Sequence, residues 1–510
     1  MRNIVAGLLL SAMYLGAQET QPSQVRYVTL DECIKAALEK NLAIRIESYT
    51  PKLGATFVKS AASVFDPVLT ASVTDYDSKS KKVFIFDSSK LNQANFNFGL
   101  AQTLKTSTSY SIAFNNQRRN MDTTFSAYKP AFDVDLAIRV TQPVLKNFGP
   151  TIAKSKMMIA MKGREASEQQ FRASVIDVIT QVQQAYLNLA YAVANLKVQQ
   201  ESLKLAQDLL EQNKIRVQVG TLAPIDILQS EAEVATREEG ILVAENSIQN
   251  YEDQLKRLMN LPGDAEDWSA TIRPSDQPNF SPRPVTEKEM VKVALDKRPD
   301  LAQLKLDLES KGINLNYTKN QLRPDLSLFF QAGSAGVGGD LVLDSDAKPL
   351  PTPVPGGYGD AFSEAMRWDY PNWTFGLNFT LPIKNDAAEA AYEQATFEQL
   401  QAQLRIANLE QQIYQEVRGA CRALDTNRKR IETTRAALRL AEKKLEAEQK
   451  KFSVGLSTNY FVLQFQKDLT QAQTNLLQAI TDHQTSLIAL DKFTGMTLER
   501  RNIEVSSSSK

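Results

Sequence analysis

Residues 171–220 read FRASVIDVITQVQQAYLNLAYAVANLKVQQESLKLAQDLLEQNKIRVQVG. The apolar residues of this stretch recur at alternating steps of four and three, which predicts a long helix packed lengthwise on another helix with a left-handed supercoil. Two polar residues, Gln199 and Asn213, occupy positions in this heptad seam. The apolar positions of the seam are Val175, Val178, Val182, Ala185, Leu189, Ala192, Leu196, Leu203, Ala206, Leu210 and Val217. A second stripe at Ile179, Tyr186 and Val193 predicts neighbours on two sides of the helix.

The same pattern occurs twice in the chain. Shifted by 235 residues, Val219-Gly220 aligns with Val454-Gly455, and a second heptad seam appears upstream of the latter pair. This second seam consists of Ile413, Val417, Ala420, Leu424, Ile431, Leu438, Ala441, Leu445 and Phe452. A spacing this regular over two long segments predicts an internal duplication of a unit of about 240 residues.

The duplication divides the chain into two repeats and three further segments. The first repeat, residues 18–262, is predicted to hold upper helices, strands at about 67–77 and 131–143, a long helix at 154–219 and a return helix at 225–260. The second repeat, residues 286–496, holds strands at about 324–333 and 372–383, a long helix at 386–454 and a return helix at 458–494. The remaining segments are an expected signal at 1–17, a Pro-rich linker at 262–285 and a C-terminal tail at 497–510.

Composition excludes several classes of function. The 510 residues carry 59 Lys and Arg against 59 Asp and Glu, so no net positive charge favours a nucleic-acid partner. A single His and two Cys leave few ligands for a metal site, and the sequence shows no nucleophile–base constellation or phosphate-binding loop. We therefore expect a protein without cofactor or metal that is not an enzyme.

The first 17 residues have the features of a secretory signal. Arg2 supplies the positive end, residues 4–15 the apolar core, and residues 15–17 a cleavage site. The apolar core is shorter than the roughly 20 residues that a membrane-spanning helix needs. Because no later segment approaches such a helix, the exported chain is either soluble or enters a membrane as a β-barrel.

The strand-like segments favour the barrel. In residues 132–140 and 373–381, large apolar side chains alternate with charged, amide, hydroxyl or small residues, the last being Ala137 and Gly376. This is the pattern of a strand with one face in lipid. Half-buried strands of a soluble sandwich are the alternative. The insertions at 79–129 and 333–371 read as outward loops, although the alternating residues Phe96 to Phe114 leave open a hairpin that adds two barrel strands.

Four strands cannot close a barrel with a water-filled interior, and open strand edges cannot face lipid. Several chains must therefore share one barrel. The expected fold is a mixed α+β membrane protein: an α/β tube with about four transmembrane strands per chain, continued by a coiled-coil α-helical barrel. Three chains would give twelve strands and twelve helical columns.

Four segments carry a resemblance to a known family. They are TLDECIKAALEKN at 29–41, QPVLKNFG at 142–149, VGTL at 219–222 and VGLS at 454–457. Together, and in this order over nearly the whole chain, they resemble the TolC family of outer-membrane efflux proteins. The resemblance implies a homotrimer in the lipid of the cell outer membrane that extends into the periplasm. It also implies a passive duct for tripartite efflux or type I secretion, with a periplasmic adaptor (membrane fusion) protein and an inner-membrane transporter as partners.

The resemblance also assigns roles to residues near the two helix turns. The expected adaptor-docking tips are Val219, Gly220, Thr221 and Leu222, and Val454, Gly455, Leu456 and Ser457. Family members often carry a ring of Asp and a tethering Arg nearby, but here Phe461 and Gln464 stand in the Asp positions and Ser457 in the Arg position. Asp226 matches a tethering Asp. We therefore expect a periplasmic gate closed by apolar and amide contacts.

The remaining polar residues receive simpler interpretations. Asp133, Asp135 and Arg139 are expected to face the barrel lumen, because a charge facing lipid near the bilayer midplane costs about 2–4 kcal/mol. Cys33 and Cys421 form either a disulfide or two separate buried thiols, and His483 is expected at the surface. The alternative function is an exported coiled-coil scaffold or adhesin, which accounts for the long helices but not for strands with lipid-type faces.

Overall fold

The computed structural model describes residues 25–84, 87–123, 125–261, 268, 270–276, 279–280 and 283–504, so the expected signal lies outside the described residues. The chain forms two compact units. We call Met1–Ser48, Phe171–Pro299 and Gln411–Ser506 the helical unit, and Tyr49–Gln170 with Asp300–Glu410 the sheet unit. The two longest helices are α5 (Ser155–Gln218), in the first predicted repeat, and α11 (Asp386–Ser453), in the second. Each of these helices has one part in the sheet unit and one part in the helical unit, so each unit contains residues of both repeats.

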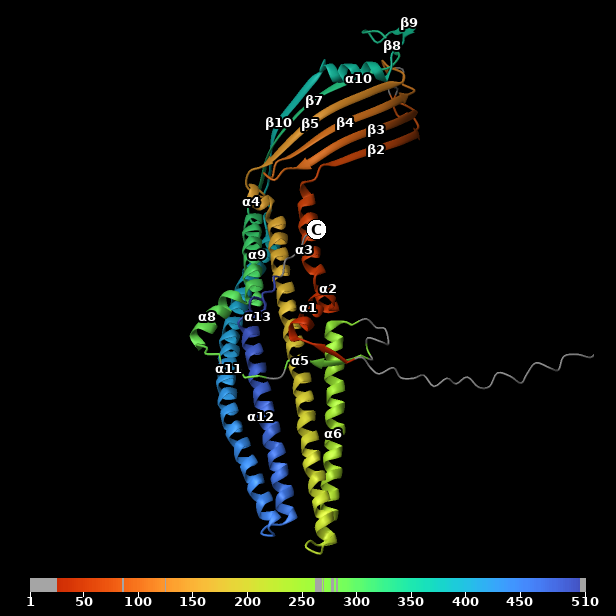
Figure 1. Cartoon of the computed structure of the whole chain (residues 1–510). Coiled ribbons are helices and arrows are strands. Elements are labelled where there is room, and N and C mark those ends of the chain that lie inside the picture. Colours follow the sequence, from red (N-terminus) through yellow and green to blue (C-terminus); the bar gives the residue numbers. More distant parts are fainter. Residues whose placement is uncertain are drawn as a thin grey trace, which may run out of the picture. The chain divides into compact units, whose positions relative to one another are not determined.

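The helical unit is built from two helical hairpins (Figure 1). The later part of α5 pairs with α6 (Pro224–Met259), and the later part of α11 pairs with α12 (Asn459–Phe493). The predicted heptad seam forms the packed side of α5, where Val182, Ala185 and Leu189 are fully buried. Ile179 of the second stripe is fully buried as well, which accounts for contacts with neighbours on two sides.

A compact core surrounds α5 in the middle of the helical unit. α1 (Leu30–Lys40) begins at Thr29, whose hydroxyl accepts the backbone N–H of Glu32 while the Glu32 carboxylate accepts that of Thr29. This reciprocal capping fixes the start of the helix. α2 (Leu42–Glu47) follows, and β1 (Val25–Val28) pairs in parallel with β6 (Thr271–Pro274) from the Pro-rich linker. The core comprises Cys33, Ala37, Val178, Ile179, Val182, Tyr186, Leu255, Ile272 and Leu498, among others.

A second cluster of the helical unit joins α11 and α12. Ala420, Leu424 and Leu490 are buried there against Met290 of α8 (Glu287–Lys297). The segment expected as a C-terminal tail begins with a short helix, α13 (Thr497–Arg500), and its Thr497 and Leu498 are buried. No helix in the described part of the chain is long and apolar enough to cross a membrane.

The sheet unit contains one antiparallel sheet of six strands in the order β10-β7-β5-β4-β3-β2 (Figure 1). The strands are β2 (Val68–Lys79), β3 (Lys90–Thr103), β4 (Ser109–Met121), β5 (Ala131–Pro143), β7 (Asp325–Gly338) and β10 (Pro371–Thr380). The expectation of four strands per chain was therefore wrong. The hairpin left open between Phe96 and Phe114 is β3 and β4, inserted between two expected strands.

The insertion expected as an outward loop at 333–371 is also largely ordered. β7 continues to Gly338, β8 (Leu341–Leu343) pairs with β9 (Pro349–Val354), and α10 (Tyr358–Arg367) precedes β10. These elements follow β7 at the end of the sheet opposite the helices. The other helices of the sheet unit are α3 (Tyr49–Ala62), α4 (Pro150–Ala153) and α9 (Pro299–Gln321), with a 3-10 turn at Ser63–Phe65.

Ion pairs join the helices within the sheet unit. Lys162 of α5 bonds Glu309 of α9 at 2.9 Å, and Lys311 of α9 bonds Glu398 of α11 at 3.1 Å. These half-exposed pairs each contribute little stability in water. Their regular placement indicates three helices that pack in a defined register.

Candidate functional site

The two helical hairpins turn at equivalent glycines. Gly220 and Gly455 have φ angles of +78° and +77°, a region that other residues enter only with strain. In both turns the residue after the glycine donates its N–H to a carbonyl five residues upstream: Thr221 to Arg216 at 2.9 Å and Leu456 to Lys451 at 2.9 Å. This is the Schellman arrangement, which satisfies helix-end carbonyls and reverses the chain sharply.

The tip residues differ in what they offer to a partner. Val219, Val454 and Leu456 expose 66%, 69% and 78% of their surface, so they form an apolar end to the two turns. Leu222, in contrast, packs against the core of the hairpin ends, which contains Leu209, Leu445 and Phe452. Ser457 donates its hydroxyl to Glu448, and this hydrogen bond lowers the pKa of the Glu448 carboxyl. The tips therefore combine exposed apolar residues with others that hold the turns in place.

Arg216 connects the ends of the two hairpins, a role that was not predicted from the sequence. Its guanidinium stacks on the Phe452 ring, 4.4 Å from the centroid, and donates to the Phe452 carbonyl at 2.9 Å. The only sequence signal was a basic residue in the last turn of α5. A contact between residues 236 positions apart cannot be read from that signal.

A buried polar cluster lies one turn further inside. Asn213, which occupies a seam position, donates to the Ser230 hydroxyl at 2.9 Å and to the Asn459 Oδ1 at 2.7 Å, and all three residues are fully buried. Asn459 in turn donates to the backbone carbonyl of Asp226 at 3.2 Å. The cluster ties α5, α6 and α12 together, and such single polar layers fix the register of coiled coils.

The three expected gate residues lie near this cluster, and no hydrogen bond joins them to one another in the described part of the chain. Phe461 is half exposed, with its ring 5.6 Å from that of Tyr460, and Gln464 donates to Asp468 on its own helix at 2.9 Å. Asp226 takes part through its backbone carbonyl. Phe461 and Gln464 are both exposed at this end of the helical unit.

A second polar layer crosses the same three helices farther from the tip. Arg237 of α6 is buried, pairs with Glu233 at 2.7 Å, and donates to the hydroxyls of Ser202 and Thr470. Ser202 and Thr470 lie 2.8 Å apart. The side chain of Arg237 therefore joins α6 to both α5 and α12.

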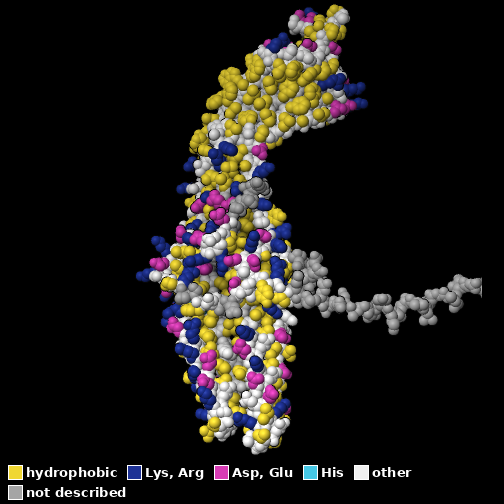
Figure 2. Space-filling view, viewed as in Figure 1, with side chains coloured by type: hydrophobic (Ala, Val, Ile, Leu, Met, Phe, Trp, Pro, Cys, Tyr) yellow, Lys and Arg dark blue, Asp and Glu magenta, His cyan; other side chains and the backbone are white. Residues whose placement is uncertain are grey.

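In the sheet unit, cross-strand register separates two faces. We call apolar face the side formed mainly by Leu69, Val73, Phe96, Phe98, Leu100, Ile112, Phe114, Phe132, Val134, Leu136, Ile138, Val140, Leu326, Leu328, Phe330, Trp373, Phe375, Leu377 and Phe379. Figure 2 shows hydrophobic side chains gathered over the strands. Trp373 exposes 73% of its surface, and Val73 and Phe375 are exposed as well, whereas Val134 is buried.

The opposite side, the polar face, carries the three residues expected to line a lumen. Asp133 pairs with Arg119 of β4 at 3.3 Å, and Asp135 accepts from Asn115 at 3.4 Å. The Arg139 guanidinium lies over the Phe329 ring, 4.3 Å from the centroid. Amides from β3 and β4, including Asn95 and Gln117, continue this hydrophilic wall.

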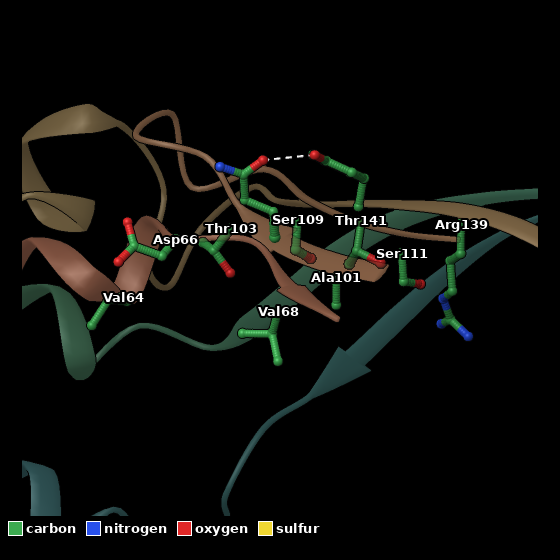
Figure 3. Close-up of a pocket in the computed structure, with 11 residues that line it drawn as sticks. Val64, Asp66, Val68, Ala101, Thr103, Ser109, Ser111, Arg139 and Thr141 are labelled. Atoms are coloured by element: carbon green, nitrogen blue, oxygen red, sulfur yellow. Dashed lines mark hydrogen bonds between the residues drawn. The ribbon is translucent and has the colours of Figure 1, made fainter. Parts of the chain in front are cut away.

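A cavity of about 280 Å³ opens where the polar face meets the helices of the sheet unit (Figure 3). Its lining includes Asp66, Thr103, Ser109, Ser111, Arg139 and Thr141. Tyr110 and Gln102 also line it: Tyr110 donates to the Gln102 Oε1 at 2.6 Å, and Gln102 donates to the Phe65 carbonyl at 2.8 Å. The hydroxyls and the single guanidinium suit a water-filled passage better than an apolar ligand.

The remaining residues singled out from the sequence have structural roles. Cys33 is buried in α1 and Cys421 half-buried in α11, and neither thiol is in a disulfide. Burial raises the pKa of the Cys33 thiol to about 12. The expectation that His483 lies at the surface was wrong: it is 1% exposed and packs against Phe280.

A sequence profile of the outer membrane efflux protein family matches residues 104–261 and 290–496, well over half of the chain. The chain belongs to this family. It is therefore a protein of the outer membrane. Both helical hairpins and four of the six strands of this outer membrane efflux protein, β4, β5, β7 and β10, fall at least partly within the matched residues. The strands outside them are β2 and β3.

Curated relatives are distant. This efflux protein is 23% identical over 341 residues to the toluene efflux pump outer membrane protein TtgC of Pseudomonas putida. The alignment covers 65% of this chain and 63% of TtgC. It is 23% identical over 328 residues to the outer membrane protein TolC of Escherichia coli, and this alignment covers 62% of this chain and 63% of TolC. The alignments thus span less than two thirds of the length of these relatives.

Solved structures show the same fold. VceC from Vibrio cholerae superposes with a TM-score of 0.64 at 17% identity, covering 91% of this efflux protein and 96% of VceC. The CmeC outer membrane channel of Campylobacter jejuni gives a TM-score of 0.64 at 16% identity, covering 99% and 98%. The coverage extends to both the helical and the sheet unit.

Proposed function

We propose that this protein is an outer-membrane channel that conducts substrates passively, as the duct of a tripartite efflux or type I secretion system. The observation that carries the proposal is the sheet: one face is apolar, and the other is lined by charges and amides. Its edge strands β2 and β10 have no outer strand partner among the residues that the structure describes. Such a sheet suits a barrel wall between lipid and water, and its edges must be paired within a bilayer.

The register of the sheet supports closure by further copies of the chain. Cross-strand partners lead from Val68, the first residue of β2, to Thr374, which lies six residues before the end of β10 at Thr380. The partners between are Ala101, Ser111, Arg139 and Gln331. If the first residue of β2 in the next copy lies beside Thr380, the register shifts by six residues across the six strands of one chain. Each chain then adds six to the shear number of the barrel.

A shear equal to the number of strands corresponds to a tilt of about 36°, as in an eight-stranded barrel of shear 8, and barrels typically tilt their strands by 35–45°. This ratio does not depend on the number of copies; the family resemblance implies three. A homotrimer would then form a barrel of eighteen strands instead of the twelve expected from four strands per chain. Because diameter grows roughly linearly with strand number, it would be about one and a half times as wide.

Within this channel, the polar face would line the lumen and the apolar face would contact outer membrane lipid. Asp133, Asp135 and Arg139 would then remain hydrated, which avoids the cost of placing charge in lipid. The helical unit would extend into the periplasm and present its two turns to a periplasmic adaptor protein, itself bound to an inner-membrane transporter. The names of TtgC and TolC support this assembly.

A conductance measurement tests the channel. Purified protein in a planar bilayer should open pores, and the native assembly should migrate as a heat-modifiable trimer in outer-membrane fractions. The scaffold or adhesin alternative assigns no role to the two-faced sheet. A protein that purifies as a water-soluble monomer without detergent would contradict both the barrel and the trimer.

Substitutions at the helix turns test the proposed docking to an adaptor. Leu456→Asp places a charge in the most exposed apolar residue of the second turn and should abolish export by the assembled system, while trimers remain in the membrane. Gly455→Asp should do the same and also strain the turn. Leu440→Asp, at an exposed leucine within α11 and away from the turn, is the matched control and should leave export intact. Normal export by Leu456→Asp would exclude a docking role.

The block of conductance by cations tests the proposed periplasmic gate. We propose that Phe461 and Gln464 from each copy, together with the backbone held through Asp226 and Asn459, close the periplasmic entrance by apolar and amide contacts. Because no carboxylate ring stands in these positions, trivalent cations added to the periplasmic side should block conductance only weakly. Block at sub-micromolar concentration would show that a ring of carboxylates lies at the entrance.

A further inference from the structure

Helix α10 lies on the apolar face of the sheet. Its Ala361 and Ala365 are fully buried against Val134 of β5. The Tyr358 ring lies 5.4 Å from that of Phe96 and 6.3 Å from that of Phe132, and Phe362 meets Phe114 edge-on at 6.0 Å. The helix thus covers part of the surface that the proposed function turns toward lipid.

The sheet is shaped to hold this helix. A Cβ at Gly336 or Gly338 of β7 would collide with the backbone of α10, so the two glycines allow the helix to approach the strand closely. Tyr358 donates its hydroxyl to the Asn116 Oδ1 at 2.9 Å, and the Glu364 carboxylate accepts the backbone N–H of Val337 at 3.1 Å. α10 is therefore a fixed part of the wall and not a passing loop.

The exposed part of α10 has two flanks of different character. Phe362 and Met366 expose 41% and 40% of their surface on one flank, next to the apolar face. Asp360 and Arg367 occupy the other flank and are also exposed. Exposed aromatic residues follow the helix at Trp368 and Tyr370. Trp and Tyr are enriched where a membrane meets water, and an amphipathic helix of this kind lies in the plane of that boundary.

We propose that α10 is an interfacial helix of the outer leaflet: the Phe362 and Met366 flank lies among lipid acyl chains, and the Asp360 and Arg367 flank among headgroups. Lipid is the occupant because the flank continues the apolar face of a protein of the outer membrane. The outer leaflet follows from chain order, since α9 leads into one end of β7 and α10 follows the other. This inference rests on the proposed function of the sheet as a barrel wall.

Nitroxide labels at adjacent positions test the proposal in the assembled protein in lipid vesicles. In a background of Cys33→Ala and Cys421→Ala, Met366→Cys and Arg367→Cys each receive a spin label, and collisions with oxygen and with a water-soluble nickel chelate are measured. The label at 366 should collide mainly with oxygen, which concentrates in acyl chains, and the label at 367 mainly with nickel. Phe362→Cys serves as a second reporter of the apolar flank if Met366→Cys does not assemble.

Two reference labels separate this inference from the proposed function. Leu377→Cys on the apolar face of β10 should favour oxygen, and Asn378→Cys on its polar face should favour nickel. If Leu377→Cys favours nickel, the lipid-facing sheet fails together with the helix. If Leu377→Cys favours oxygen but labels at 362 and 366 collide with nickel as often as the label at 367, only the interfacial helix is overturned.

Discussion

At the residue scale, His483 shows that a residue with polar neighbours in the sequence can be buried in the fold. Its neighbours Asp482 and Gln484 are polar, which suggested a surface position, yet the imidazole packs edge-on against the Phe280 ring with centroids 5.0 Å apart. Burial lowers the pKa of His483, because the charged form loses its hydration. The folded protein therefore holds a neutral histidine at a pH where the unfolded chain would begin to protonate it.

This shift predicts a pH dependence of stability. The unfolded histidine titrates near pH 6.5 and the folded one below it, so the unfolded state binds more protons as the pH falls through 6.5. Stability should fall from pH 7.5 to pH 5.5, by at most about 1.4 kcal/mol for each unit by which the pKa is lowered. Helical circular dichroism during thermal unfolding measures this slope. His483→Leu should reduce the slope, and an unchanged slope would contradict the assignment.

Asn213 marks the limit of sequence reasoning for single residues. Its place in the heptad seam was visible as a polar interruption, and the structure shows it buried. Its partners Ser230 and Asn459 lie 17 and 246 residues away in the chain, so they could not be identified from spacing. A heptad pattern predicts which side of a helix is packed, but not which helix packs on it.

At the element scale, the alternation of apolar and polar residues predicted strands more reliably than it predicted loops. The pattern in β3 and β4 was visible around Phe96 and Phe114, but a hairpin and an outward loop could not be separated, because cross-strand partners determine the outcome. Phe98 pairs with Phe114, and Phe114 with Leu136 of β5, so the hairpin continues the apolar face. α10 was missed because its ten residues lie in a Gly- and Pro-rich insertion.

The polar layer around Arg237 makes a prediction at the same scale. Glu233→Ala removes the carboxylate and leaves a buried guanidinium with only two hydroxyl partners, which should cost about 1–3 kcal/mol. Arg237→Met removes the buried charge itself and should cost less, because replacing a buried ion pair by apolar groups is often neutral. Chemical unfolding followed by circular dichroism compares the two. A larger loss for Arg237→Met would show that the guanidinium contributes net stability.

At the scale of the whole molecule, the outline of the fold was predictable and its closure was not. Two long helical hairpins, the glycine turns and a two-faced sheet all follow from periodicity. We propose, in addition, that the matching order of elements reflects an internal duplication, with β3 and β4 as an insertion in the first copy. How the sheet closes depends on other copies of the chain, about which heptads and alternation carry no information.

The register of the sheet allows closure to be tested directly. If β2 of one copy begins level with the end of β10 in the next, Val68 and Thr380 of neighbouring chains lie side by side, both on the polar face. In a background of Cys33→Ala and Cys421→Ala, Val68→Cys combined with Thr380→Cys should form disulfides between chains under mild oxidation. Non-reducing electrophoresis should then show a covalent trimer that resists heating.

The matched control is Val68→Cys with Thr374→Cys, whose positions share one row of the sheet but lie on its opposite edge strands. Disulfides require Cα atoms within about 7 Å, so this pair cannot close within one chain, and the proposed stagger keeps it apart between chains. Efficient cross-linking of the Thr374 pair would mean that the edges meet without the six-residue offset, and the strand tilt inferred here would be wrong. Monomers from both pairs would show that β2 and β10 do not meet at all.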